Sequence, residues 1–239
     1  MKRTVFGFIF WAFASIAFAQ YDISKSWEGA QVHVPGSFFT KSVDNVTVDR
    51  PLPTIVLMHG CGGIQQHEGQ WAQFLKSQGY IVVLPNSYAI PGRVMNCDPR
   101  SSTPNLRLVP VNDLRPAEAE YTFNQLKKQS WVDQKNIFLM GHSEGGMAAA
   151  YTREVGFNAV VISSFICHQG VNAGQDTPVL AISFETDPYF TGRWNFYCKD
   201  RWGDRPKSKQ VILPGNGHPT YWEPKARQEV LDFIKAYTK

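Results

Sequence analysis

The sequence predicts an α/β protein with a mostly parallel central sheet and helices on both faces. Three observations lead to this prediction: short β-branched apolar runs recur along the chain, segments with helical periodicity separate them, and no linker or internal repeat divides the pattern. Strands that alternate with helices form parallel sheets whose crossover helices cover both faces. A length of 239 residues suits one domain with a sizeable core.

Residues 1–19 have the features of a cleavable secretory signal peptide. A short basic start precedes an uncharged apolar stretch, which ends in the small-x-small triplet Ala17-Phe18-Ala19. A membrane anchor is the alternative, but the stretch is shorter than the roughly 20 residues that span a bilayer. We therefore expect export to the periplasm or the extracellular space, a single mature domain over residues 20–239, and no stable membrane insertion after the signal is removed.

The charge of the chain argues against a nucleic-acid partner. The formal net charge of +4 falls to +2 when Lys2 and Arg3 leave with the signal peptide. A charge this small does not indicate a surface that binds a polyanion. No other segment is long and apolar enough to cross a membrane, so we expect a soluble product.

The remaining elements are expected in the following chain order. Residues 31–49 alternate in the manner of short strands and predict an N-terminal hairpin or sheet edge. The buried strands are short apolar runs, rich in β-branched residues, over residues 54–58, 80–84, 136–140, 159–163, 178–184 and 210–213. Helical patterns cover residues 70–77, 113–129, 145–155 and 225–237. The long irregular stretch 86–110 has a length that is often functional.

The sharpest chemical signal is the motif Gly141-His142-Ser143-Glu144-Gly145-Gly146, which fits G-x-S-x-G between an expected strand and an expected helix. Such a turn holds its serine in a strained conformation above the sheet, and glycines let the helix cross close to the strand. The helix N-terminus favours negative charge beside the serine. We therefore predict Ser143 as a nucleophile on an α/β-hydrolase fold; a tight turn with an incidental serine is the alternative.

A serine needs a base to take its proton and an acid to orient that base. In this fold the acid and then the histidine follow the serine along the chain. His218 lies in a loop directly after the last expected strand and is the predicted base, whereas His168 follows an earlier strand and is the weaker candidate. Asp187 follows the strand 178–184 and is the predicted acid. Glu185 competes with it, and Asp176 is disfavoured because it precedes that strand.

A glycine-rich loop, His59-Gly60-Cys61-Gly62-Gly63, follows the first buried strand. Glycines let backbone N–H groups approach a substrate oxygen closely. We expect the N–H of Cys61 or Gly62, together with the N–H of Glu144, to form an oxyanion hole for a tetrahedral intermediate. A plain turn or a phosphate cradle is the alternative, but no G-x-x-x-x-G-K-[ST] motif is present.

Together these motifs resemble the dienelactone hydrolase family. The resemblance extends from about Pro53 to the C-terminus and rests on Met58-His59-Gly60-Cys61-Gly62-Gly63, Trp71-Ala72, Gly79-Tyr80, Leu84-Pro85-Asn86-Ser87-Tyr88 and the motif around Ser143. It implies the α/β-hydrolase fold, a Ser/Cys–His–Asp triad and hydrolysis of ester or lactone bonds. The founding members use a Cys nucleophile and are cytoplasmic, whereas this chain has a serine at that position and a signal-like N-terminus.

The cysteines of the mature chain are Cys61, Cys97, Cys167 and Cys198. An even number in an exported chain favours disulfides over free thiols. Three pairings are possible, and the sequence alone does not choose between them. Cys61–Cys97 with Cys167–Cys198 is the favoured interpretation, because each pair joins loops that are expected to leave neighbouring strands. No C-x-x-C, Cys/His cluster or paired histidine motif has metal-ligand spacing, so we expect neither a metal nor a cofactor.

Two further features have open interpretations. Arg93 and Arg100, in the stretch 86–110, either bind a substrate carboxylate or belong to a solvated loop face. A group of aromatic side chains after Asp187 either lines the substrate pocket or packs in the core. Its members are Trp194, Phe196, Tyr197 and Trp202.

The predicted function is an exported serine hydrolase that cleaves a small-molecule ester or lactone through an acyl-enzyme intermediate. A peptidase or amidase of the same fold would use the same catalytic set. A non-catalytic binding protein that keeps the fold is a third possibility. The intact set of serine, acid, histidine and glycine-rich loop argues against it, because a binding protein has no chemical need for all four.

Overall fold

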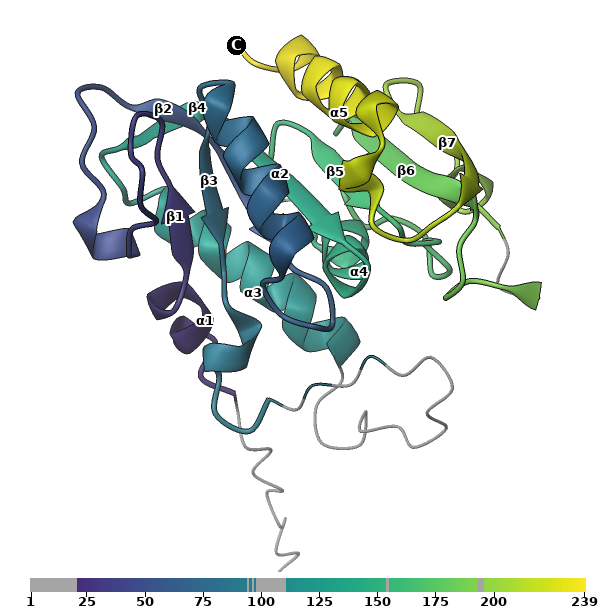
Figure 1. Ribbon diagram of the computed structural model, residues 1–239, viewed down its shortest axis with the longest axis horizontal. Coiled ribbons are helices and arrows are strands. Elements are labelled where there is room, and N and C mark those ends of the chain that lie inside the picture. Colours follow the sequence, from purple (N-terminus) through teal and green to yellow (C-terminus); the bar gives the residue numbers. More distant parts are fainter. Residues whose placement is uncertain (1–20, 94, 96, 98–110, 154, 193–195) are drawn as a thin grey trace, which may run out of the picture.

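The computed structural model describes residues 21–93, 95, 97, 111–153, 155–192 and 196–239 (Figure 1). The expected signal peptide, residues 1–19, lies outside these ranges, as do Arg100 and Trp194. Among the described helices, none is long and apolar enough to cross a membrane.

The described residues form a seven-stranded sheet in the order β1-β3-β2-β4-β5-β6-β7 (Figure 1). The strands are β1 (Gln31–His33), β2 (Leu52–Met58), β3 (Ile81–Leu84), β4 (Val132–His142), β5 (Val160–Ser163), β6 (Val179–Thr186) and β7 (Lys209–Asn216). β1 runs antiparallel to β3, and every other neighbouring pair is parallel. The predicted parallel sheet with an N-terminal edge strand is therefore confirmed.

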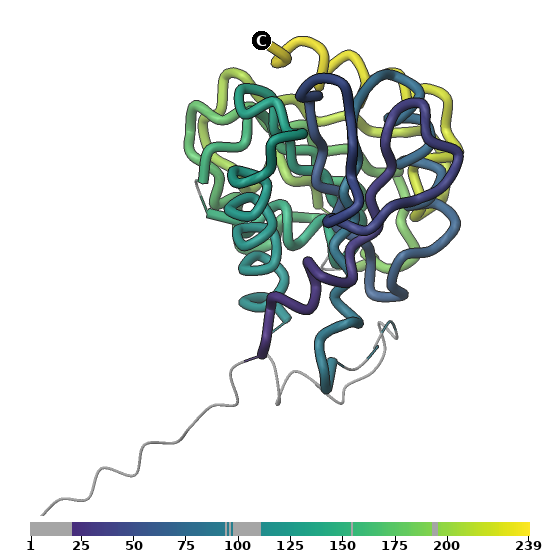
Figure 2. Tube along the Cα trace, turned by 90° about the vertical axis from the view of Figure 1, so that its left-hand side faces the viewer, coloured from purple at the N-terminus to yellow at the C-terminus, as the bar shows by residue number. Residues whose placement is uncertain are grey.

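Helices cover both faces of the sheet, as predicted. On one face α1 (Ser24–Glu28), α3 (Val111–Leu126) and α4 (Glu144–Tyr151) pack against alternate strand residues, among them Val56 and Met58 of β2. On the other face α2 (Gln66–Ser77) and α5 (Pro224–Ala236) pack against the intervening residues, among them Ile55 and Leu57. Figure 2 shows the turns of α3, in teal, on the left of the molecule. Since residues 55–58 of β2 are buried on both faces, they form a continuous apolar run rather than an alternating one.

Some element boundaries differ from the prediction for identifiable reasons. α2 begins at Gln66 rather than residue 70, because Gln65 and Glu68 form a capping box in which the Gln65 N–H donates to Glu68 Oε2 at 3.0 Å. α4 ends at Tyr151 rather than residue 155, because Thr152, with φ −59° and ψ 131°, lies outside the helical region. The short segments η1 (Val43–Asn45), η2 (Ser87–Ala89), η5 (Cys198–Asp200) and η6 (Thr220–Trp222) are 3₁₀ turns.

The topology brings the predicted chemical groups to one edge of the sheet. β2, β4, β6 and β7 are mutually parallel, so their carboxyl ends lie at the same edge. The glycine-rich loop follows β2, Ser143 follows β4, Asp187 follows β6 and His218 lies two residues beyond β7. Ligands of open α/β sheets bind at this edge, so a ligand site is expected there.

Candidate active site

Ser143 lies in a sharp turn between β4 and α4. Its backbone has φ 55° and ψ −115°, which is unusual for a residue with a side chain. The turn is anchored because the Ser143 N–H donates to the carbonyl of Ser163 in the neighbouring strand β5, at 2.9 Å. The strained serine that the G-x-S-x-G motif predicts is therefore present at the start of a helix.

The glycines of the motif are required by close approach of backbone to backbone. A Cβ on Gly145 would lie 2.0 Å from the carbonyl oxygen of Met58, and a Cβ on Gly141 would lie 1.9 Å from that of Gly145. Both distances are far below van der Waals contact, so neither position accepts a side chain without movement of the chain. α4 consequently crosses directly against the ends of β4 and β2.

His218 and Asp187 meet at the ends of β7 and β6. The two strands stay paired to their ends through Thr186 and Asn216, and the Gly217 N–H donates to the Thr186 carbonyl at 3.0 Å. This pairing places His218 Nδ1 2.7 Å from Asp187 Oδ2. The second carboxylate oxygen, Oδ1, accepts the backbone N–H of Tyr189 at 2.9 Å. Each oxygen of the Asp187 carboxylate thus accepts a hydrogen bond, and the residue is buried.

The alternative acids and the alternative base lie elsewhere. Glu185 is exposed and accepts the N–H of Gly215 at 3.1 Å. Asp176 is fully exposed, 3.9 Å from the ammonium group of Lys207. His168 lies beside the Tyr151 hydroxyl, with Nδ1 3.2 Å from it. The structure therefore brings Asp187, and neither Glu185 nor Asp176, to His218.

The glycine-rich loop lies against the serine. A Cβ built on Gly60 would be 3.5 Å from the Ser143 Cβ. Among the residues that the structure describes, the N–H groups of Cys61, Gly62 and Glu144 donate to no acceptor. Three donors without partners beside a serine are the arrangement expected of an oxyanion hole.

The serine, the histidine and the glycine-rich loop share a cavity of about 240 Å³. Its other walls come from residues that the sequence analysis did not assign to a pocket. They are Gln65, His67, Glu68, Cys97, His142, Tyr189 and Pro219. Tyr189 covers the imidazole of His218, with ring centroids 4.4 Å apart. A larger hollow of about 860 Å³ lies around Pro178 and Lys239, but no candidate catalytic residue lines it, so we place the site in the smaller cavity.

Two buried histidines of the site are neutral. Burial, reinforced by His67 and His218, holds the pKa of His142 well below its ordinary value of 6.5. Burial also lowers the pKa of His59, and the cationic Arg115 and Arg93 lower it further, against a hydrogen bond to Gly60 that favours the charged form. Neither ring therefore adds a positive charge beside the serine near neutral pH.

The two disulfides join the pairs that the sequence analysis favoured. Cys61 is bonded to Cys97, and Cys167 is bonded to Cys198. The first of these ties the glycine-rich loop to the stretch 86–110. Cys97 thereby becomes part of the cavity wall, a placement that spacing alone could not indicate.

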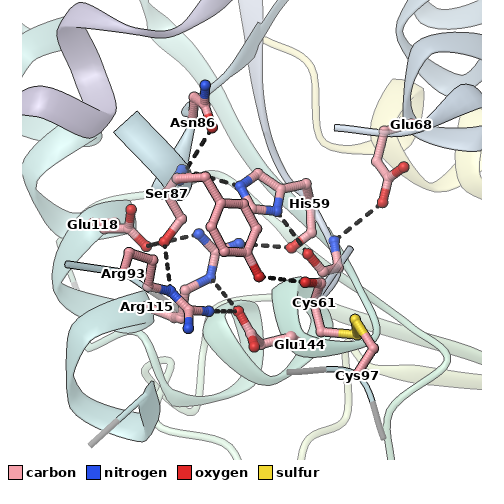
Figure 3. A network of polar contacts seen from close by, with 12 residues as sticks. His59, Cys61, Glu68, Asn86, Ser87, Arg93, Cys97, Arg115, Glu118 and Glu144 are labelled. Carbon is pink, nitrogen blue, oxygen red and sulfur yellow. Dashed lines mark hydrogen bonds and ion pairs between the residues drawn. A yellow bond between two sulfur atoms is a disulfide. The ribbon is translucent and has the colours of Figure 1, made fainter. Parts of the chain in front are cut away.

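Arg93 belongs to a buried ion network (Figure 3). The Arg93 guanidinium lies 2.5 Å from Glu144 Oε1, and its side chain is 5% exposed. It does not line the cavity, and its side chain is buried against a protein carboxylate, so neither the substrate carboxylate nor the solvated loop face was the correct interpretation. The described members of the aromatic group, Phe196, Tyr197 and Trp202, do not line the cavity either. Trp202 packs instead against the core.

The described part of the chain holds no group of three His, Cys, Asp or Glu side chains arranged to bind a metal ion. What the site offers is a strained serine, an imidazole with a carboxylate partner and unpaired backbone donors. These are the components of nucleophilic acyl transfer.

Comparison with solved structures shows the same fold. A cold-adapted esterase from an Arctic intertidal metagenomic library, in a PEG-bound complex, is 14% identical, with a TM-score of 0.59 over 80% of this chain and 85% of that chain. A protein described as a dienelactone hydrolase, from Klebsiella pneumoniae subsp. pneumoniae MGH 78578, is 13% identical, with a TM-score of 0.57 over 80% and 88%. A dienelactone hydrolase-like promiscuous phosphotriesterase from metagenomic libraries is 13% identical, with a TM-score of 0.61 over 87% and 92%. At these identities the likeness establishes the α/β-hydrolase fold.

The family is established by sequence. No curated protein sequence matches the chain, but the profile of the dienelactone hydrolase family matches residues 42–220. The match spans most of the chain and includes the glycine-rich loop, Ser143, Asp187 and His218. The chain therefore belongs to the dienelactone hydrolase family, as its motifs indicated, and is a hydrolase that acts on ester bonds.

Proposed function

We propose that this chain is an exported serine hydrolase that cleaves a small-molecule ester or lactone, with Ser143 as nucleophile, His218 as base and Asp187 as the acid that orients the base. The observation that carries the proposal is the 2.7 Å contact between His218 Nδ1 and Asp187 Oδ2, at the wall of the cavity that Ser143 also lines. Because Asp187 accepts the Nδ1 proton, Nε2 of His218 is left as a proton acceptor. That is the tautomer a general base requires.

In the proposed reaction Ser143 Oγ attacks the acyl carbon while His218 Nε2 takes the hydroxyl proton. The N–H of Glu144 and the N–H of Cys61 or Gly62 donate to the oxyanion of the tetrahedral intermediate. The intermediate collapses, the bond to the alkoxy oxygen breaks, and that oxygen takes the proton from His218. Water then attacks the acyl-enzyme while His218 takes its proton, and His218 gives that proton to Ser143 Oγ as the bond to the acyl carbon breaks, which releases the acid and the free serine.

Export is supported by two independent features. Residues 1–19 have the pattern of a signal peptide, and all four cysteines are paired in disulfides. Disulfides persist in oxidising compartments and are rare in the cytosol. An exported ester hydrolase is consistent with both features.

The test is covalent labelling of the purified protein with a fluorophosphonate probe, followed by location of the adduct by mass spectrometry. We expect one adduct, on Ser143, that is absent from Ser143→Ala and retained by Ser77→Ala, a control at an exposed serine of α2. Turnover of simple acyl esters and lactones, but not of peptide anilides, would support the substrate class. Labelling at another residue, or no labelling of folded protein together with no ester turnover, would refute the proposal.

A further inference from the structure

Arg115 of α3 is the most deeply buried cation among the described residues, and it lies among Glu118, His59 and Glu144 (Figure 3). Its side chain has no exposed surface. Burial opposes its charge, but Glu118 and Glu144 outweigh that effect and hold the pKa of Arg115 above its ordinary value. Its guanidinium is therefore a permanent cation inside the protein.

The three nitrogen atoms of this guanidinium lie against three different segments. Nη1 donates to Glu118 Oε2, within α3, at 2.7 Å. Nη2 donates to the backbone carbonyl of His59 at 2.6 Å. Nε lies 3.2 Å from Oε1 of Glu144, an ion-pair contact that lacks hydrogen-bond geometry. A planar guanidinium fixes these partners relative to one another, as a flexible ammonium group could not.

One of the three partners, Glu144, supplies a donor of the proposed oxyanion hole, and another, His59, precedes the opposite donor in the chain. Glu144 supplies the N–H that follows the serine. His59 begins the loop that supplies the opposite N–H, from Cys61 or Gly62. Arg115 therefore connects the side chain of one donor residue to the backbone immediately before the other donor.

Further side-chain contacts surround the connection that Arg115 makes between Glu144 and His59. Arg93 Nη2 also binds Glu144, and its Nε lies 3.3 Å from Ser87 Oγ. Ser87 Oγ donates to Glu118 Oε2 at 3.0 Å, and the Ser87 N–H donates to His59 Nε2 at 3.0 Å. The hydroxyl of Tyr88 donates to the Cys61 carbonyl. The glycine-rich loop is thus held by side chains, whereas glycines alone would leave it free to move.

Stability alone does not explain such a network. Taking charged groups out of water costs free energy, and buried ion pairs often add nothing to stability compared with apolar residues of similar volume. The donors of an oxyanion hole, by contrast, must be held within about 0.5 Å of their productive positions. Two arginines and two glutamates with balanced charge surround these donors. Such a set is better explained by the need to hold the donors in position than by a gain in stability.

We propose that Arg115 is a positioning residue that holds the two donors of the oxyanion hole at a fixed separation. This inference rests on the proposed function of the same site. Arg115 touches no reacting atom and acts through Glu144 and the His59 carbonyl. A misplacement of about 1 Å at a catalytic group can cost about 10²-fold in rate.

The test compares Arg115→Lys with Arg205→Lys. Arg205 is a buried arginine that also donates to backbone carbonyls, those of Gly174 and Val171, away from the cavity. For Arg115→Lys we expect kcat to fall by about 10²-fold with little change in KM. The affinity for a trifluoromethyl ketone, which forms a tetrahedral adduct on the serine, should fall in parallel. Arg205→Lys should lower the melting temperature but leave kcat and the ketone affinity unchanged.

A second variant and a second readout keep the test decisive. If Arg115→Lys does not fold, Glu144→Gln removes the charge that Arg115 holds, and we expect the same loss in kcat over KM. Amide hydrogen exchange at residues 59–62 and 143–146 should accelerate in Arg115→Lys or Glu144→Gln and not in Arg205→Lys. Wild-type kcat, ketone affinity and exchange in a folded variant would overturn the inference. An inactive wild type would instead refute the proposed function, and the exchange readout would still decide whether Arg115 orders the loop.

Discussion

Replacement of Asp187 by Asn tests the acid of the proposed triad against its neighbour in sequence. Both oxygens of the Asp187 carboxylate act as acceptors, one for His218 Nδ1–H at 2.7 Å and one for the Tyr189 N–H at 2.9 Å. An asparagine has one oxygen and one NH₂ group in the same space. It can satisfy only one of the two donors.

The two orientations of the asparagine side chain differ in free energy. If its oxygen faces His218, its NH₂ group faces the Tyr189 N–H, and an unsatisfied buried donor costs about 1–3 kcal/mol. If its oxygen faces Tyr189, the NH₂ group donates to His218 Nδ1, and the imidazole proton moves to Nε2. Both polar pairs are then satisfied, so the second orientation is favoured. In it, Nε2 of His218 carries a proton and cannot accept one from Ser143.

We therefore expect Asp187→Asn to lower kcat by about 10⁴-fold, the size of effect known for the wrong tautomer in a Ser-His-Asp enzyme, or about 5 kcal/mol in activation free energy. The assay is steady-state hydrolysis of an acyl ester. Glu185→Gln is the matched control, because Glu185 is exposed and bound to Gly215; its kcat should stay within about twofold of wild type. Equal losses in both variants, or a loss in Glu185→Gln alone, would refute the assignment of Asp187.

Two further predictions concern the fold around the site. Gly145→Ala should abolish activity and prevent stable folding, because its Cβ would lie 2.0 Å from the Met58 carbonyl oxygen. Gly69→Ala in α2, where the space is open, should be neutral or stabilising by about 0.5–1 kcal/mol. Thermal melts of both variants check this. Stability should fall as the pH drops below about 6.5, because His59 and His142 are neutral when folded and become protonated when unfolded. Each histidine contributes up to about 1.4 kcal/mol per pH unit in that range. Urea unfolding that gives the same free energy at pH 7 and pH 5 would contradict this.

The sheet was predictable because its strands carry their signal locally. β2 and β3 are continuous apolar runs, and the crossover rules that order parallel strands leave few arrangements to consider. Boundaries were less predictable where side chains extend an element. The capping box of Gln65 and Glu68 adds a turn to α2 before its apolar residues begin, so apolar periodicity alone missed it.

Chain order and loop position indicated which groups would meet at the edge of the sheet, but sequence could only rank the candidate acids. Asp187 and Glu185 are two residues apart at the end of β6, where the register with β7 decides which side chain faces His218. That register shifts between Phe184 and Thr186, and the local sequence does not indicate the shift. The cavity wall formed by Tyr189 and Cys97 depends likewise on a ring contact and a disulfide between distant segments.

The interpretation of Arg93 shows most clearly where sequence reasoning ends. For this loop arginine the sequence left open a substrate carboxylate or a solvated loop face, yet its partner is Glu144, whose backbone N–H is itself a proposed donor. The G-x-S-x-G motif treats that glutamate as an arbitrary residue. In this fold its carboxylate binds two arginines, Arg93 from the loop and Arg115 from α3. A residue that a motif leaves undefined can therefore link the turn that carries Ser143 to the rest of the proposed oxyanion hole, and only the positions of its charged partners reveal that link.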